Sequence, residues 1–266
     1  MLKRLRYVRK VAIDLTNFER GDAFAGDFTT ALTALQQRLA QAQIAQIVHR
    51  KRALIILEGW TGAGKKAALK RLVGSWDACH IATRCVGGAD GGTDDRHWLA
   101  PYWSALPPAG DTTIFYHSWY RRLIEERAAG LLDGKRWSRA CDEINEFEAQ
   151  QRDHGTVVVK LFFHISAGQQ QQRLNERQAD PWCRHLPEAE APPTRDERER
   201  TTAALHDLFA QTDTRWAPWR VIDANDKCAG RIAALTLLAD AFDKAIPSEP
   251  PATGETIVSF PHQKSA

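Results

Sequence analysis

Short apolar runs alternate with longer amphipathic segments along most of this chain of 266 residues. Apolar residues recur at helical spacing over residues 28–50, and the uninterrupted apolar run 53–57 follows them. Further strands are predicted at 80–86, 112–116, 156–165 and 219–223. Because strands that alternate with helices form parallel sheets with right-handed crossovers, the pattern predicts a three-layer α/β/α fold.

The segments between these strands carry helical periodicity or capping residues. Ser118 is placed to cap a helix after the third strand, and Asp226 to cap the last helix. The other helices are predicted at 67–73, 95–106, 138–152, 166–177, 198–211 and 227–245.

The distribution of glycine and proline predicts three parts of the chain. Residues 1–28 are predicted to be an extended arm, and residues 29–246 form one domain. Within that domain a lid is expected over about 173–195, and its part 180–195, which carries four prolines, is expected to be a loop or lid. The proline-containing tail 247–266 is expected to be disordered.

Composition and charge narrow the classes of function. The 43% of hydrophobic and 26% of charged residues are typical of a soluble globular protein, and a net charge of only +3 argues against nucleic-acid binding. Five scattered cysteines without a CxxC pair favour reduced thiols over disulfides or zinc. With no signal-peptide pattern and no apolar run of membrane-spanning length, we expect a cytoplasmic protein without a membrane partner.

A glycine-rich loop lies between the first strand and the helix predicted at 67–73. In such a loop, backbone N–H groups and the positive end of the helix surround a phosphate, and a lysine adds a charge. Lys66 stands where the P-loop pattern has Ser or Thr, whose hydroxyl helps to hold magnesium. The candidate phosphate-binding residues here are Gly59, Thr61, Gly62, Ala63, Gly64, Lys65 and Lys66.

Two further polar segments follow predicted strands, at 116–118 and 223–225. Ligands of parallel α/β sheets bind beyond the carboxyl ends of the strands, where these segments and the glycine loop all fall. The sequence therefore predicts one shared cleft.

Residues 58–65, which read E-G-W-T-G-A-G-K, resemble the Walker A segment E-G-[RW]-D-A-A-G-K of the family-2 polyphosphate kinases. Residues 115–120 resemble the Walker B segment F-D-R-S-W-Y of the same family, and residues 126–127 match the E-R after it. The spacing of residues 173–181 is similar to the family's lid segment, and residues 212–227 follow its C-terminal segment. The resemblance extends from about residue 32 to about residue 240.

This resemblance implies a P-loop kinase fold with a helical lid. It implies a phosphotransferase that moves a phosphoryl group between polyphosphate and ADP, GDP or AMP, uses Mg²⁺, and forms homo-oligomers, commonly tetramers. At positions that match the family's motifs, arginines would neutralise the charge of the transferred phosphoryl group. The implied catalytic residues are Lys65, Arg122 and Arg177, and Arg121, Arg173 and Arg184 are implied to bind phosphate or nucleotide.

The departures from the family pattern fall on the metal-binding side of the chemistry. Thr61 replaces the Walker A aspartate, Tyr116 and His117 replace the Walker B Asp-Arg pair, and the lid reads Arg-His-Leu at 184–186. Losing one metal-holding carboxylate costs roughly a factor of 10² in rate. The expectation of Mg²⁺ is thereby weakened, and Thr61 and water would be its remaining ligands. The carboxylates at 94–95 could replace the missing metal ligands, or they could simply be negative charges at a helix N-terminus.

Alternatives therefore stay open at the level of sequence. The first is a catalytically degenerate homologue that binds polyphosphate or nucleotide in a regulatory role. The second is an ATP-dependent P-loop kinase of nucleotides or small molecules. Side chains also have structural readings: Arg121 and Arg122 as a solvated helix face, and Trp119, Tyr120, His164 and Trp219 as core residues.

Overall fold

Five parallel strands form a single sheet with the order β2-β3-β1-β4-β5 in the computed structural model, which describes residues 12–85, 97–186 and 191–252. The strands are β1 (Arg52–Gly59), β2 (Ile81–Cys85), β3 (Thr112–Tyr116), β4 (Thr156–His164) and β5 (Trp219–Asp223). The central strands β1 and β4 read as nearly continuous apolar runs because helices cover both of their faces.

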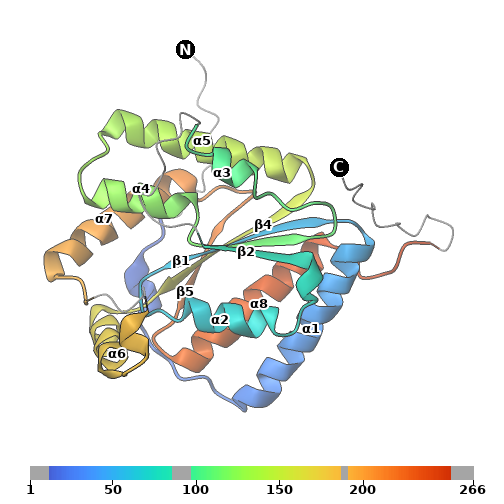
Figure 1. Ribbon diagram of the computed structural model, residues 1–266, viewed down its shortest axis with the longest axis horizontal. Helices are drawn as coiled ribbons and strands as arrows, with labels where there is room; N and C mark the ends of the chain where they lie inside the picture. Colours follow the sequence, from blue (N-terminus) through green and yellow to red (C-terminus); the bar gives the residue numbers. More distant parts are fainter. Residues whose placement is uncertain (1–11, 86–96, 187–190, 253–266) are drawn as a thin grey trace.

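The sheet lies between two layers of helices, so the predicted three-layer α/β fold is confirmed (Figure 1). Helices α1, α2 and α8 cover one face, and α3, α4, α5 and α7 cover the other. The helices are α1 (Phe28–Val48), α2 (Lys65–Val73), α3 (Ala100–Trp103), α4 (Trp119–Ala128), α5 (Gly134–Asp153), α6 (Ala167–Ala179), α7 (Arg195–Thr212) and α8 (Lys227–Ala245), with short 3₁₀ turns η1 (Leu15–Phe18), η2 (Ala78–His80) and η3 (Cys183–His185).

The two predicted helix caps are confirmed. The Ser118 side chain accepts a hydrogen bond from the N–H of Tyr120 at the start of α4. The Asp226 carboxylate accepts from the N–H groups of Cys228 and Ala229 at the start of α8. Both caps satisfy donors that the first helical turn leaves unpaired.

Two helices differ most from the prediction. The helix expected over 95–106 is only the single turn α3, which begins next to Pro101, a residue whose missing N–H suits a first helical turn. Helix α5 begins four residues earlier than predicted, because Asp133 caps it by accepting from Lys135 and Arg136 N–H.

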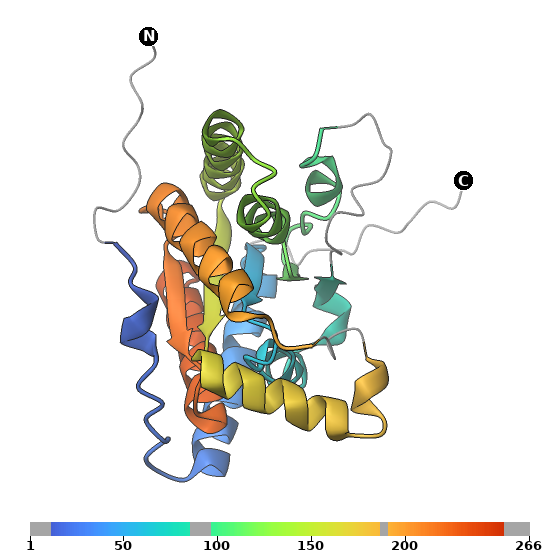
Figure 2. The same ribbon diagram turned by 90° about the vertical axis from the view of Figure 1, so that its left-hand side faces the viewer.

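The described part of the N-terminal arm is not simply extended. It contains η1, whose Leu15 is 2% exposed, and it lies beside β5 (Figure 2). Gly21 N–H donates to the Asp223 carboxylate over 2.8 Å, so the arm is tied to the carboxyl end of β5. The predictions for residues 1–11, 86–96, 187–190 and 253–266, including Asp94 and Asp95, concern positions outside the described residues.

The core holds one buried charged network on the α5 and α7 side of the sheet. Lys160, which is 0% exposed in the middle of β4, donates to Glu148, to the Tyr120 hydroxyl and to the Thr212 carbonyl over 2.8–2.9 Å. Its ammonium also lies 5.0 Å from the ring centre of Trp219. Burial lowers the pKa of Lys160, although the Glu148 carboxylate opposes this effect.

The predicted core positions of Trp119, Tyr120, His164 and Trp219 are confirmed, since each is at most 3% exposed. Within the described ranges, no helix has both the length and the apolar character needed to cross a bilayer.

Replacing Lys160 by Met should destabilise the fold by about 3–5 kcal/mol, because the Glu148 carboxylate would stay buried without its cation. Urea unfolding followed by circular dichroism measures this change. The double variant Lys160→Met with Glu148→Gln is the matched control, and it should recover more than half of the loss. A loss under about 1 kcal/mol in the single variant would contradict the prediction.

Candidate active site

The glycine loop begins where β1 touches the backbone of β4. Gly59 has φ +132°, and a Cβ placed on it would lie 2.2 Å from the carbonyl oxygen of Phe163. The next residue, Trp60, donates its N–H to that same carbonyl over 3.2 Å. Only glycine fits at position 59, and this close approach directs the loop into the N-terminus of α2.

Lys65, the first residue of α2, is buried within the loop. The residue is only 3% exposed, and its Nζ donates hydrogen bonds to the carbonyl oxygens of Gly59 (2.5 Å) and Trp60 (3.0 Å). The same Nζ lies 5.8 Å from the ring centre of Tyr116 at the end of β3. The Walker A-like loop and the Walker B-like strand end therefore meet, as the predicted cleft requires.

Glu58, on β1, connects the end of β1 to the turn after β3. Its Oε1 accepts from the Ser118 N–H (2.6 Å) and the Ser118 hydroxyl (2.9 Å), and its Oε2 lies 3.5 Å from Nδ1 of His117. His117 adopts the left-handed conformation, with φ +67°, which is uncommon for a residue other than glycine. A buried carboxylate thus holds the turn after β3 against the end of β1.

Arg173 connects the glycine loop to the end of β5. It is 7% exposed and donates to the carbonyl oxygens of Gly62 (3.1 Å), Ala224 (2.9 Å) and Asn225 (2.6 Å). Burial lowers the pKa of the Arg173 guanidinium, and a neighbouring arginine adds to this effect. The structure thus places this predicted phosphate ligand beside the loop, as a brace on its backbone.

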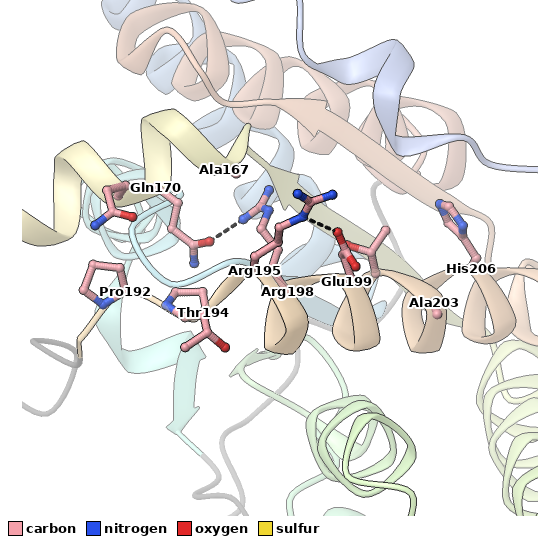
Figure 3. Close-up of a pocket in the computed structure, with 12 residues that line it drawn as sticks. Ala167, Gln170, Pro192, Thr194, Arg195, Arg198, Glu199, Ala203 and His206 are labelled. Carbon is pink, nitrogen blue, oxygen red and sulfur yellow. Dashed lines mark hydrogen bonds and ion pairs between the residues drawn. The ribbon is translucent and has the colours of Figure 1, made fainter.

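A second brace comes from α7. The Arg198 guanidinium lies 4.1 Å from the ring centre of Trp60, donates to the Ile165 carbonyl over 2.5 Å, and donates to the Gln170 side chain. Gln170 in turn donates to the Thr61 carbonyl over 3.1 Å. Figure 3 shows Arg198 and Gln170 pointing toward one another in a pocket of about 650 Å³ between α6 and α7.

Trp60 also forms a hydrogen bond to the last residue of β4. Its indole N–H donates to Nδ1 of His164 over 2.8 Å, and Nε2 of His164 lies 2.9 Å from a carboxylate oxygen of Glu19 in the arm. Accepting at Nδ1 requires a neutral imidazole with its proton on Nε2. Burial lowers the pKa of His164, although Glu19 opposes this.

The other predicted cations are exposed or half-buried. In α4, Arg121 and Arg122 pair with Glu125 and Glu126 over 2.7 and 2.6 Å. The remaining three are the exposed Lys66 on α2, the half-buried Arg177 on α6 and the exposed Arg184 on η3. Their functional roles stay predictions.

The donor set around the loop does not fit a magnesium ion held by the protein. Magnesium is usually bound through one or two carboxylates together with substrate phosphates. The Glu58 carboxylate is committed to Ser118 and His117, and Tyr116 places a phenol ring where a carboxylate is expected. Among the described residues, no three His, Cys, Asp or Glu side chains cluster as a metal site.

This chain is similar to known proteins over most of its length. The family model described as polyphosphate kinase 2 matches residues 25–250. The chain belongs to this family.

Relatives with named activities are similar over most of this chain. A polyphosphate:AMP phosphotransferase of Acinetobacter johnsonii is 33% identical over 221 residues, which cover 83% of this chain and 46% of that protein. One of Pseudomonas aeruginosa is 31% identical over 219 residues, covering 80% and 44%. The chain thus spans about half the length of these two relatives. An ADP-polyphosphate phosphotransferase of Rhizobium meliloti is 30% identical, covering 84% and 72%.

A solved family member has the same fold. The crystal structure of polyphosphate kinase 2 from Arthrobacter aurescens TC1 superposes with a TM-score of 0.77 at 26% identity, covering 94% of this chain and 92% of that one. The similarity to this solved structure confirms the fold class that the sequence predicted for the present chain.

Sequence reasoning named Arg173 but missed Gln170 and Arg198, which also brace the loop. Helical spacing does place Gln170 and Arg173 on one face of α6, a signal that could have linked Gln170 to the loop. Arg198 carried no such signal, because it reaches Trp60 only through the folding of α7 over α6.

We expect acid to destabilise the protein through His164. The unfolded chain binds a proton near the ordinary pKa of 6.5, whereas the folded chain does so only at lower pH. The contribution of neutral His164 is therefore complete above pH 6.5 and is lost as the pH falls through the lowered folded pKa. Unfolding free energies measured between about pH 7 and 5 should fall less steeply for His164→Gln.

The matched control is His206→Gln, which changes an exposed histidine on α7. Its pH dependence should follow that of the unsubstituted protein. If His164→Gln keeps the full acid sensitivity, the proposed role of the Trp60–His164 hydrogen bond in that sensitivity is wrong.

Proposed function

We propose that this chain is a phosphotransferase that moves a phosphoryl group between inorganic polyphosphate and a nucleotide (ADP, GDP or AMP). The observation that carries the proposal is the intact phosphate cradle, with Lys65 at its centre, in a polyphosphate kinase 2 family member. The names of the relatives support the substrate classes, since they include AMP, ADP and GDP phosphotransferases.

In this mechanism the reacting phosphate rests on the loop amides and Lys65. The Lys65 ammonium would exchange its bonds to the Gly59 and Trp60 carbonyls for phosphate oxygens. Phosphoryl transfer depends mostly on positioning and on neutralising charge, which a buried ammonium and backbone N–H groups supply.

Arginines around the cleft would neutralise the rest of the charge. Arg177 lies one helical turn beyond the buried Arg173 on α6, and Arg122 lies on α4 after the Walker B-like turn. Arg121 and Arg184 would add charge at the entrance. Guanidinium groups suit this role because they bind phosphate oxygens in pairs.

Magnesium enters the proposal only as a counter-ion carried by the substrate phosphates, since no three His, Cys, Asp or Glu side chains cluster as a metal site among the described residues. Thr61, the metal ligand proposed from sequence, could add at most one hydroxyl oxygen. The localisation and assembly proposed from sequence, a cytoplasmic homo-oligomer such as a tetramer, need fractionation and light scattering to test them.

A specific observation favours a second candidate function, binding without turnover. Thr61 and Tyr116 stand where the family pattern has aspartates, and Tyr116 turns its ring toward Lys65. In that case the chain would bind polyphosphate or nucleotide in a regulatory role.

The deciding experiment is a phosphotransfer assay with polyphosphate and ADP, GDP or AMP, with and without Mg²⁺. We expect turnover with at least one nucleotide. Calorimetric binding of polyphosphate without any turnover would instead establish the regulatory candidate.

Lys65→Ala should lower kcat/KM by about 10²–10³-fold, because it removes the buried cation on which the transferred charge rests. Steady-state kinetics measures the effect. Lys244→Ala, at the exposed C-terminal end of α8, is the matched control and should stay within about twofold. Equal rates for Lys65→Ala and Lys244→Ala would show that the loop does not handle the reacting phosphate.

The double variant Thr61→Asp with Tyr116→Asp should increase Mg²⁺-dependent turnover by at least about tenfold, since it returns two carboxylates to the cleft. Initial rates over a range of Mg²⁺ concentrations measure it. The control is Thr61→Asn with Tyr116→Asn, which has similar size and no added charge and should not gain activity. No gain in the aspartate variant would mean that the missing carboxylates do not limit the rate.

A further inference from the structure

Glu58 and His117 form a carboxylate–imidazole pair at the carboxyl edge of the sheet. The register of β1 and β3, which lie side by side in Figure 1, pairs Leu57 with Tyr116, and the next residue on each side is a member of the pair. Oε2 of Glu58 lies 3.5 Å from Nδ1 of His117, and the two side chains are 3% and 14% exposed. The pair therefore lies at the edge where ligands of parallel α/β sheets bind.

The carboxylate determines which ring nitrogen of His117 can react. A carboxylate beside Nδ1 favours the tautomer that carries its proton on Nδ1, which leaves the lone pair on Nε2. Over residues 12–85, 97–186 and 191–252, Nε2 of His117 has no hydrogen-bond partner. By contrast, both ring nitrogens of His164 have polar partners, Trp60 and Glu19. His117 thus keeps a nucleophilic atom that the fold does not use.

The backbone holds the imidazole of His117 in place. With φ +67° the residue is in the left-handed region, and its N–H donates to the Leu57 carbonyl over 3.3 Å. Both the N–H and the hydroxyl of the following Ser118 donate to Glu58. Residues other than glycine that are fixed in this conformation cluster at active sites, where the surrounding structure maintains them. The conformation therefore favours a chemical role for His117 over a purely structural one.

Tyr116 lies between the imidazole and the cation of the phosphate cradle. Its ring centre is 4.7 Å from that of His117, and Nζ of Lys65 lies 5.8 Å from the same tyrosine ring. A phosphate that rests over Lys65 is therefore in the neighbourhood of the imidazole.

The charge of the two substrates favours a reaction in two steps. Direct transfer brings polyphosphate and a nucleotide phosphate, both strongly anionic, into contact, and metal ions held by carboxylates usually neutralise them. Here the donor set around the loop does not fit such an ion, because the Glu58 carboxylate is committed to Ser118 and His117. A neutral imidazole would let each anion react with the protein separately, so that the two anions need not meet.

We propose that Nε2 of His117 is the catalytic nucleophile that carries the phosphoryl group between polyphosphate and the nucleotide. This inference rests on the proposed function and deepens it, since it assigns the step by which the group is transferred. Glu58 is the positioning residue that holds the proton on Nδ1. Histidine forms covalent intermediates of this kind when a neighbouring group orients it.

Each half of the reaction exchanges one bond to phosphorus for another. In the first, the Nε2 lone pair forms a P–N bond to the terminal phosphorus, and the electron pair of the broken P–O bond leaves with the shortened polyphosphate. In the second, a phosphate oxygen of the nucleotide forms a P–O bond, and the electron pair of the P–N bond returns to Nε2. The proton on Nδ1 stays beside Glu58 throughout.

Incubation with polyphosphate alone tests the first half directly. Mass spectrometry of the intact protein should show one added phosphoryl group, and peptide mapping should place it on His117. Because a phosphoramidate is labile to acid and stable to base, the label should be lost in acid only. Adding ADP, GDP or AMP should discharge it, and steady-state rates should follow ping-pong kinetics.

His117→Asn removes the nucleophile and keeps a residue that tolerates left-handed backbone. It should abolish the phosphoenzyme and lower kcat by at least about 10²-fold. Glu58→Gln should slow phosphoenzyme formation by at least about tenfold, with unchanged calorimetric affinity for polyphosphate. His80→Gln is the matched control, because Nδ1 of His80 also lies beside a carboxylate, that of Asp111 at 2.7 Å, but before the strands begin. It should stay within about twofold, and thermal melting should show that all variants are folded.

The outcomes separate this inference from the proposed function. Turnover without a phosphoenzyme, a phosphoryl group mapped to another residue, or full activity in His117→Asn would overturn the role of His117 and leave the activity standing. A phosphoenzyme that no nucleotide discharges would support His117 and refute transfer to nucleotides. With neither turnover nor a phosphoenzyme, both proposals are wrong.

Discussion

The phosphate cradle depends on the contact between Gly59 and the backbone of Phe163. The parallel register of β1 and β4 pairs these two residues, and the missing side chain lets the strands stay in hydrogen-bonding distance up to the last residue of β1. The chain then turns directly into α2, which places Lys65 inside the loop. Any Cβ at position 59 would separate the two strands at the point where the site begins.

Around this contact, the loop is held by groups from distant parts of the chain. Arg173 spans from the loop to the end of β5, and Arg198 stacks on Trp60 from α7. Both hold their positions by hydrogen bonds to neutral oxygens. A carbonyl oxygen solvates a guanidinium without cancelling its charge, whereas a carboxylate would cancel it. The braces therefore leave positive charge beside the cradle, which suits an anionic substrate.

The same distribution of charge separates a cationic half of the candidate site from a carboxylate half. The cationic half of the expected site is kept in the loop and in α6, where Lys65 and Arg173 lie. The carboxylate half is reduced to Glu58, which is buried and serves to hold the Ser118 turn. In the proposed function, phosphate and metal would be bound by different residues, so one capacity could be lost without the other.

The sequence by itself determined the strands, the glycine loop, the caps at Ser118 and Asp226, and the family, because each rests on residues adjacent in the chain. The extent of α3, the 3₁₀ turn in the arm and the bracing by Gln170 and Arg198 were decided by tertiary structure. Local patterns report backbone preferences and periodic burial. They do not report which side chain reaches a carbonyl far away in the chain, as Arg173 does when it donates to the Gly62 and Asn225 carbonyls.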